Sequence, residues 1–193
     1  MPLSQHHLVI GGQRSGKSRQ AERMARAWQG QAADREVVVL ATALSSDDEM
    51  RARIERHRQD RPAGFLTMEE PHELAQALRR ASSPGRLVLV DCLTLWLTNV
   101  LMPAGHGEGP GTAPGPRPWT ALQAELLEAL PALPGPVVLV SNEIGWGVIP
   151  MGREVRQFVD ELGRLNQEVA QCCGHITLMA AGQAWTRPVE RWA

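Results

Sequence analysis

The chain has 193 residues, of which 43% are hydrophobic and 21% are charged, with a formal net charge of −1. This length and composition predict one globular domain over residues 1–193. The balanced charge excludes the basic footprint of a protein that binds nucleic acid or anionic membranes. Cys92, Cys172 and Cys173 have neither the number nor the spacing of a disulfide framework or a zinc site.

The N-terminus reads MPLSQHHLVIGGQ, without the basic stretch and apolar core of a secretory signal peptide. The longest apolar runs, such as LVLVD and PVVLVS, are too short to span a bilayer. We therefore expect a soluble cytoplasmic protein without a membrane span.

Short apolar runs alternate with longer amphipathic stretches along the chain. The runs are apolar throughout, as in strands buried on both faces, and they lie at residues 7–10, 37–43, 86–92, 136–143 and 175–181, with a further candidate at 65–70. The amphipathic stretches predict helices near residues 17–29, 47–60, 71–81, 94–102, 119–130 and 153–173. This alternation predicts an α/β fold, a mostly parallel sheet flanked by helices on both faces.

The sequence GGQRSGKS, between the first strand and the first helix, matches the phosphate-binding pattern G-x-x-x-x-G-K-[S/T]. Its glycines allow backbone N–H groups to point at phosphate oxygens, and the helix N-terminus adds partial positive charge. Lys17 is expected to reach the β- and γ-phosphates of a nucleoside triphosphate, and the Ser18 hydroxyl to bind Mg²⁺. The alternative, a chance glycine-rich turn, is disfavoured by the Lys-Ser pair and by the flanking strand and helix.

His57 lies on the second predicted helix, on the same face as Met50 and Ile54. A histidine on such an apolar face is most often a satisfied residue at the edge of the core. The alternative is a nucleophile, because a neutral imidazole with a pKa of about 6.5 can attack the α-phosphate of a nucleoside triphosphate. The neighbouring Arg58 and Arg61 could then hold phosphate or face water.

Two acidic residues end predicted central strands. Asp91 ends RLVLVD, where P-loop proteins hold Mg²⁺ directly or through water. Its alternative role is an ordinary cap of the next helix. Glu143 ends PVVLVSNE and is a second candidate, as a general base or a substrate contact.

Two loops also stand out. Residues 103–118, PAGHGEGPGTAPGPRP, are dense in glycine and proline and predict a mobile surface loop. Strand-like runs continue on both sides of this loop, so it is not a domain linker. Residues 142–150, NEIGWGVIP, are rich in turn residues but carry large apolar side chains. They form either a wall of a large substrate pocket or a surface cluster of turns.

Taken together, these stretches resemble the bifunctional adenosylcobinamide kinase / adenosylcobinamide-phosphate guanylyltransferase family of cobalamin biosynthesis. The resemblance rests on GGQRSGKS, on ATALSSDDEMRARIERHRQDRP followed by TMEEP, on VDCLTLWLTNVL, and on VSNEIGWGVIPMGREVRQFVDELGRLNQEVA. It spans most of the chain from Gly11 to Ala170. The tail AAGQAWTRPVERWA and the length of the Gly/Pro-rich loop depart from the family pattern.

The resemblance implies a P-loop NTPase fold of the RecA-like kind, a homo-oligomer, and two reactions. The aminopropanol hydroxyl of adenosylcobinamide is phosphorylated with ATP or GTP. GMP is then transferred from GTP to that phosphate through a guanylylated histidine, which falls on His57, to give adenosylcobinamide-GDP. The nucleotide contacts that it implies are Gly11, Gly12, Gln13, Arg14, Ser15, Gly16, Lys17, Ser18, Ala41, Thr42, Ala43, Arg58, Gln59, Asp60, Arg61, Glu69 and Asp91.

Two other functions remain possible on the sequence. One is a P-loop kinase of small molecules that transfers only the γ-phosphate, without a covalent intermediate. The other is a RecA-like NTPase module that acts on nucleic acid, which would need a basic surface lined with aromatic residues. The second is disfavoured by 20 Lys and Arg against 21 Asp and Glu, no Tyr and two Phe.

Overall fold

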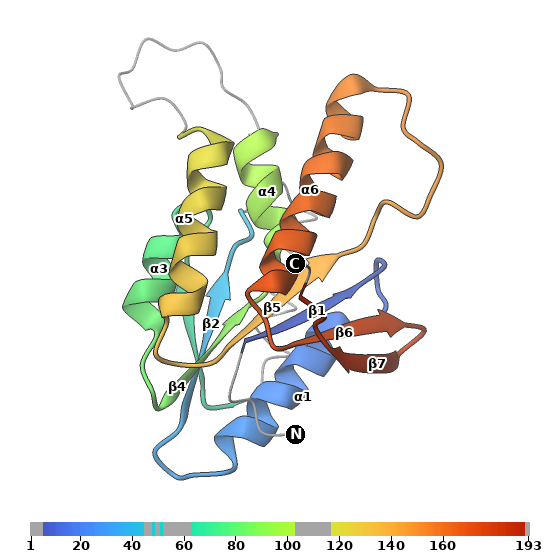
Figure 1. Ribbon diagram of the computed structural model, residues 1–193. Helices are drawn as coiled ribbons and strands as arrows, with labels where there is room; N and C mark the ends of the chain where they lie inside the picture. Colours follow the sequence, from blue (N-terminus) through green and yellow to red (C-terminus); the bar gives the residue numbers. More distant parts are fainter. Residues whose placement is uncertain (1–5, 45–47, 49–50, 52–62, 103–116, 192–193) are drawn as a thin grey trace.

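The computed structural model describes residues 6–44, 48, 51, 63–102 and 117–191. Its centre is a seven-stranded sheet with the strand order β3-β2-β4-β5-β1-β6-β7 (Figure 1). All neighbouring strands are parallel except β6 and β7, which are antiparallel. The strands are β1 (His7–Gly11), β2 (Glu36–Ala41), β3 (Phe65–Glu69), β4 (Arg86–Val90), β5 (Val137–Asn142), β6 (His175–Ala180) and β7 (Gln183–Pro188).

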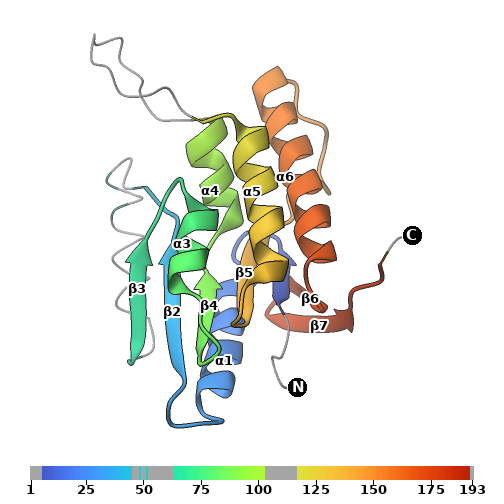
Figure 2. The same cartoon turned by 60° about the vertical axis from the view of Figure 1, so that its left-hand side comes forward.

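The helices cover both faces of the sheet, as the sequence predicts. α1 lies on one face, and α3, α4, α5 and α6 lie on the other (Figures 1 and 2). Their bounds are α1 (Lys17–Gln29), α3 (Leu74–Ala81), α4 (Leu93–Leu101), α5 (Trp119–Ala132) and α6 (Arg153–Gln171). The mostly parallel α/β sheet is therefore confirmed.

Two apolar cores follow from the alternation of side chains along the central strands. In β1, Leu8 faces the core under α3 to α6, whereas Val9 faces the core under α1. Both side chains are fully buried. This burial on both faces explains why the central strands are apolar throughout. Trp96 adds a fully buried ring to the larger core, where it packs edge-to-face against Trp119 at a centroid distance of 5.2 Å.

The sheet has two exposed edges, β3 and β7. The candidate strand at residues 65–70 is confirmed as β3. β7 was not predicted: its residues belong to the tail that departs from the family pattern. It follows β6 through the two-residue turn Ala181–Gly182, and both turn residues have positive φ, 50° and 76°. Such a turn matches the twist of an antiparallel pair.

Parts of two predicted segments lie outside the described residues. The predicted helix at residues 47–60 is described only at Asp48 and Arg51, both helical and joined by an ion pair. The Gly/Pro-rich segment is described only at Arg117 and Pro118, so its predicted mobility stays a prediction. Within the described ranges, no helix combines the length and apolar character needed to cross a membrane.

Candidate nucleotide-binding site

The candidate site lies at the carboxyl ends of the parallel strands, where ligands bind in open α/β sheets. The phosphate loop, Gly11–Ser18, connects β1 to α1. In the sheet, β5 lies between β1 and β4. The register places the ends of β1 and β5 side by side, because Gly11 pairs with Asn142.

Backbone geometry shows why glycine is needed in this loop. Gly16 forms the N-cap of α1 at φ 100° and ψ 10°, in the left-handed region that favours glycine. Gly11 has φ 152°, and a Cβ at this position would lie 2.2 Å from the Met179 carbonyl oxygen. A side chain at Gly11 would therefore push β6 away from the loop. Arg14 is a non-glycine residue with positive φ, 55°.

Lys17 and Ser15 place polar atoms inside this loop. The Lys17 side chain is only 9% exposed, and its Nζ donates a hydrogen bond to the Gly12 carbonyl at 2.7 Å. The Ser15 Oγ is buried and finds no hydrogen-bond partner within the described part of the chain. A buried hydroxyl usually has a partner, so this atom fits a site that receives oxygen atoms of a ligand. Ser18 lies in the first turn of α1.

Asp91 follows β4 and is held by Thr42, which follows β2. The Thr42 N–H donates to Asp91 Oδ1 at 3.0 Å. The Thr42 hydroxyl lies 3.1 Å from the same oxygen and 2.6 Å from the Cys92 carbonyl, so its single proton favours the carbonyl. Asn99 Nδ2 in turn donates to the Thr42 carbonyl at 2.7 Å. These contacts fix the carboxylate at the edge of the sheet.

The alternative role of Asp91, as the cap of the next helix, is wrong. The N-cap of α4 is Cys92, whose Sγ accepts a hydrogen bond from the Leu95 N–H at 3.4 Å. Burial raises the pKa of the Cys92 thiol above its ordinary value, so this cap is neutral. Asp91 is therefore not needed to begin the helix.

Glu143 also lies beside the phosphate loop. Its backbone N–H donates to the Gly11 carbonyl at 3.0 Å, and its Oε1 accepts from the Gly145 N–H at 3.3 Å. The side chain is half-buried. Its assignment as a base or substrate contact stays a prediction.

The β6–β7 turn also belongs to this site, although the sequence did not predict it. The Gly182 N–H donates to the Ser15 carbonyl at 3.1 Å. A Cβ at Gly16 would lie 3.5 Å from both Gly182 Cα and Met179 Cε. The turn therefore packs against the phosphate loop and supports its backbone at Ser15 and Gly16. The two-residue Ala-Gly connection after an apolar run is the signal that could have revealed it.

The chain is similar to known proteins over most of its length. The family model described as cobinamide kinase / cobinamide phosphate guanyltransferase matches residues 7–186. The chain belongs to this family. The match confirms the family resemblance seen in the sequence, and it covers both the phosphate loop and most of the unpredicted strand β7.

Named members of the cobinamide kinase / cobinamide phosphate guanyltransferase family match most of the chain. The bifunctional adenosylcobalamin biosynthesis protein CobP of Pseudomonas aeruginosa is 48% identical over 91% of this chain and 92% of its own. The CobU proteins of Escherichia coli and Salmonella typhimurium are 38% and 36% identical, each over 91% of this chain and 95% of its own. Among solved structures, the flagellar accessory protein FlaH from Methanocaldococcus jannaschii gives a TM-score of 0.48 at 11% identity, over 96% of this chain and 77% of that chain.

The structure brings together only some of the site residues that family resemblance implied. The phosphate loop and Asp91 lie at the same edge of the sheet, together with Thr42. Glu69 lies further along that edge, exposed at the end of β3 and paired in register with Ala41. Five further implied residues lie outside the described residues: His57, Arg58, Gln59, Asp60 and Arg61.

Proposed function

We propose that this protein phosphorylates adenosylcobinamide with ATP or GTP and then transfers GMP from GTP to the new phosphate, giving adenosylcobinamide-GDP. The observation that carries this proposal is the family match over residues 7–186 to a chain that holds a complete phosphate loop. It is supported by the arrangement of Lys17, Ser15 and Asp91 at one edge of the sheet.

In the first reaction, the substrate hydroxyl attacks the γ-phosphorus while the bond to the β-phosphate oxygen breaks. The backbone N–H groups of the phosphate loop and the Lys17 ammonium would stabilise the charge on the phosphate oxygens. Glu143 is our candidate to accept the hydroxyl proton, since its backbone N–H already bonds to Gly11. Because little covalent chemistry is left to the protein, positioning and electrostatics would supply most of the rate.

Ser18 and Asp91 are the residues that would hold Mg²⁺. Their hydroxyl and carboxylate oxygens are the donors that this ion prefers, and Asp91 is already oriented by the Thr42 N–H. Among the residues that the structure describes, no group of three or more His, Cys, Asp and Glu could hold a metal ion. Mg²⁺ is commonly bound through one or two carboxylates together with substrate phosphates. When bound, Mg²⁺ would neutralise charge on those phosphates.

In the second reaction, we assign the nucleophile to His57. A ring nitrogen would attack the α-phosphorus of GTP, and pyrophosphate would leave. The phosphate of the corrinoid would then attack the same phosphorus, the nitrogen–phosphorus bond would break, and the imidazole would be restored. Two displacements replace one difficult step, which is the advantage of a covalent intermediate.

We also propose that the protein works in the cytoplasm as a homo-oligomer and does not bind nucleic acid. The formal net charge of −1 supports the last point.

Product analysis tests the two reactions separately. The protein is incubated with adenosylcobinamide and γ-labelled ATP, and then with α-labelled GTP. We expect label from ATP in adenosylcobinamide phosphate and label from GTP in adenosylcobinamide-GDP. Label from ATP alone would leave a small-molecule kinase, and no labelled corrinoid from either nucleotide would refute the proposal.

A further inference from the structure

The connection between β5 and α6, residues 143–152, exposes several large apolar side chains. Trp146 is 75% exposed, Val148 96%, Ile149 77% and Met151 95%. Single exposed apolar residues are common on protein surfaces, but a cluster in one segment indicates an interaction site. Figure 1 shows the connection projecting from the sheet before it reaches α6. We refer to these four side chains as the apolar loop.

Polar contacts fix both ends of this connection. At its start, the Glu143 N–H donates to the Gly11 carbonyl at 3.0 Å. At its end, Arg156 Nη1 donates to the Pro150 carbonyl at 3.0 Å and also to the Met151 carbonyl. The exposed apolar side chains therefore lie on a segment that is held in place.

The connection begins beside the phosphate loop. Glu143 bonds directly to Gly11, the first residue of that loop. The described groups within the site are mainly polar or charged, as Lys17 and Asp91 illustrate, and they suit a triphosphate. The apolar loop suits an apolar part of the second substrate instead of the triphosphate. In open α/β sheets, substrates enter at this same edge.

We infer that the apolar loop binds the corrin macrocycle of cobinamide while the side arm reaches the nucleotide. This inference rests on the proposed function. A corrin is a broad conjugated ring with methyl groups on its faces, and an indole offers a flat apolar surface of matching kind. The reacting hydroxyl lies at the end of a flexible arm, so the ring can bind beside the phosphate loop instead of inside it.

Serine substitutions in the apolar loop test this inference. The variants are Trp146→Ser and Ile149→Ser. The matched control is Trp185→Ser, because Trp185 is 57% exposed and lies on β7, which β1 and β6 separate from β5. All three side chains already face water, so thermal midpoints should stay within about 2 °C of wild type.

The readouts are the Kd for cobinamide in equilibrium dialysis, followed by corrin absorbance, and the KM values of the kinase reaction. We expect the Trp146→Ser variant to raise the Kd and KM for cobinamide about tenfold, which corresponds to about 1.4 kcal/mol. The KM for ATP should change less than about twofold. The Trp185→Ser control should match wild type in every measurement.

An unchanged Kd for cobinamide in both loop variants would overturn the inference. If these variants also form a smaller oligomer in sedimentation, the apolar loop joins copies of the chain and does not bind the corrin. A different result separates the inference from the proposed function. Wild type would bind cobinamide but transfer no phosphate to it, and the Trp146→Ser variant would bind cobinamide weakly. In that case the inference stands and the proposed function fails. If wild type phosphorylates cobinamide normally and both loop variants keep the wild-type Kd, the proposed function stands and the inference fails.

Discussion

The Gly182 N–H donates a hydrogen bond to the Ser15 carbonyl at 3.1 Å, joining the β6–β7 turn to the phosphate loop. Met179, at the end of the same hairpin, lies against Gly11 through its carbonyl and near Gly16 through its Cε. The phosphate loop is therefore supported by a strand pair that follows it by more than half the chain. This support suggests that the hairpin keeps the loop in a shape that receives phosphate.

Replacing Gly182 with alanine should loosen this support. Gly182 has φ 76°, and an L-residue in this region costs about 1–2 kcal/mol. We expect a lower thermal midpoint and a higher KM for ATP. The control is Gly163→Ala in α6, where a Cβ meets nothing within 4 Å. That variant should be more stable by about 0.5–1 kcal/mol, with wild-type kinetics. Equal stability and KM in the Gly182→Ala variant and wild type would argue against the supporting role.

The two glycines at the start of the phosphate loop should differ sharply. A Cβ at Gly11 would lie 2.2 Å from the Met179 carbonyl oxygen, whereas a Cβ at Gly12 meets nothing within 4 Å. We expect the Gly11→Ala variant to lose about 1–3 kcal/mol of unfolding free energy or more, and the Gly12→Ala variant to remain near wild type. Denaturant unfolding of both variants checks this. Similar losses of unfolding free energy in both variants would show that the contact with β6 is not the cause of the destabilisation.

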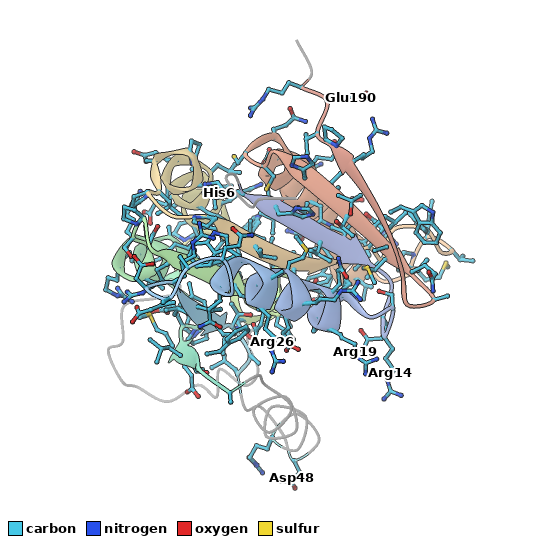
Figure 3. The ribbon with its side chains drawn as sticks, turned by 90° about the horizontal axis from the view of Figure 1, so that it is seen from below. His6, Arg14, Arg19, Arg26, Asp48 and Glu190 are labelled. Carbon is cyan, nitrogen blue, oxygen red and sulfur yellow. The ribbon has the colours of Figure 1, made fainter. Side chains whose placement is uncertain are left out.

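Lys17→Ala should abolish the kinase reaction. Lys17 Nζ lies within the phosphate loop, and loss of one preorganised donor costs roughly 3–4 kcal/mol of transition-state stabilisation. The control is Arg26→Ala: Arg26 is exposed, and nine residues of helix place it about 14 Å along α1. Figure 3 shows the Arg26 side chain pointing away from the sheet. The measurement is kcat/KM for cobinamide phosphorylation, and near-normal turnover in the Lys17→Ala variant would refute the assigned role.

Acid should destabilise the protein partly through His7. Burial, and secondly the nearby charge of His175, lower the pKa of His7 from 6.5 to about 4. As the pH falls below 6.5, the unfolded chain takes up this proton before the folded protein does. The folded state therefore loses stability between about pH 6.5 and pH 4, by roughly 2–3 kcal/mol.

The substitution His7→Gln isolates this contribution. His7 Nε2 lies 2.7 Å from Thr177 Oγ1, and a glutamine amide can reach the same hydroxyl without titrating. The unfolding free energy of wild type should therefore fall more steeply than that of the variant between about pH 7 and pH 4.5. Parallel pH profiles would show that His7 is not responsible. Burial also lowers the pKa of His6, so a shallower slope should remain in the variant.

The sequence predicts the central part of this fold well for a physical reason. Strands buried on both faces must be apolar throughout, as in VVVLA and LVLV, and the phosphate loop needs glycine where the backbone turns. α1 begins and ends where predicted. The further candidate strand at residues 65–70 is β3 in the structure.

Long-range contacts could not be predicted in the same way. β7 is exposed along its whole length, so it carries no apolar pattern, and the bond from its turn to Ser15 depends on the fold. The hold of Thr42 on Asp91 is similar: 49 residues separate the pair, and only the parallel order of β2 and β4 brings them together. Local pattern identifies strands and motifs, whereas these contacts arise from sheet topology.

The proposed second reaction requires covalent guanylylation of His57. Intact mass after incubation with GTP and Mg²⁺, without cobinamide, tests it most directly. We predict that wild type gains the mass of one GMP and that the His57→Asn variant gains nothing. A wild type without added mass, or a variant that gains the same mass, would contradict the claim.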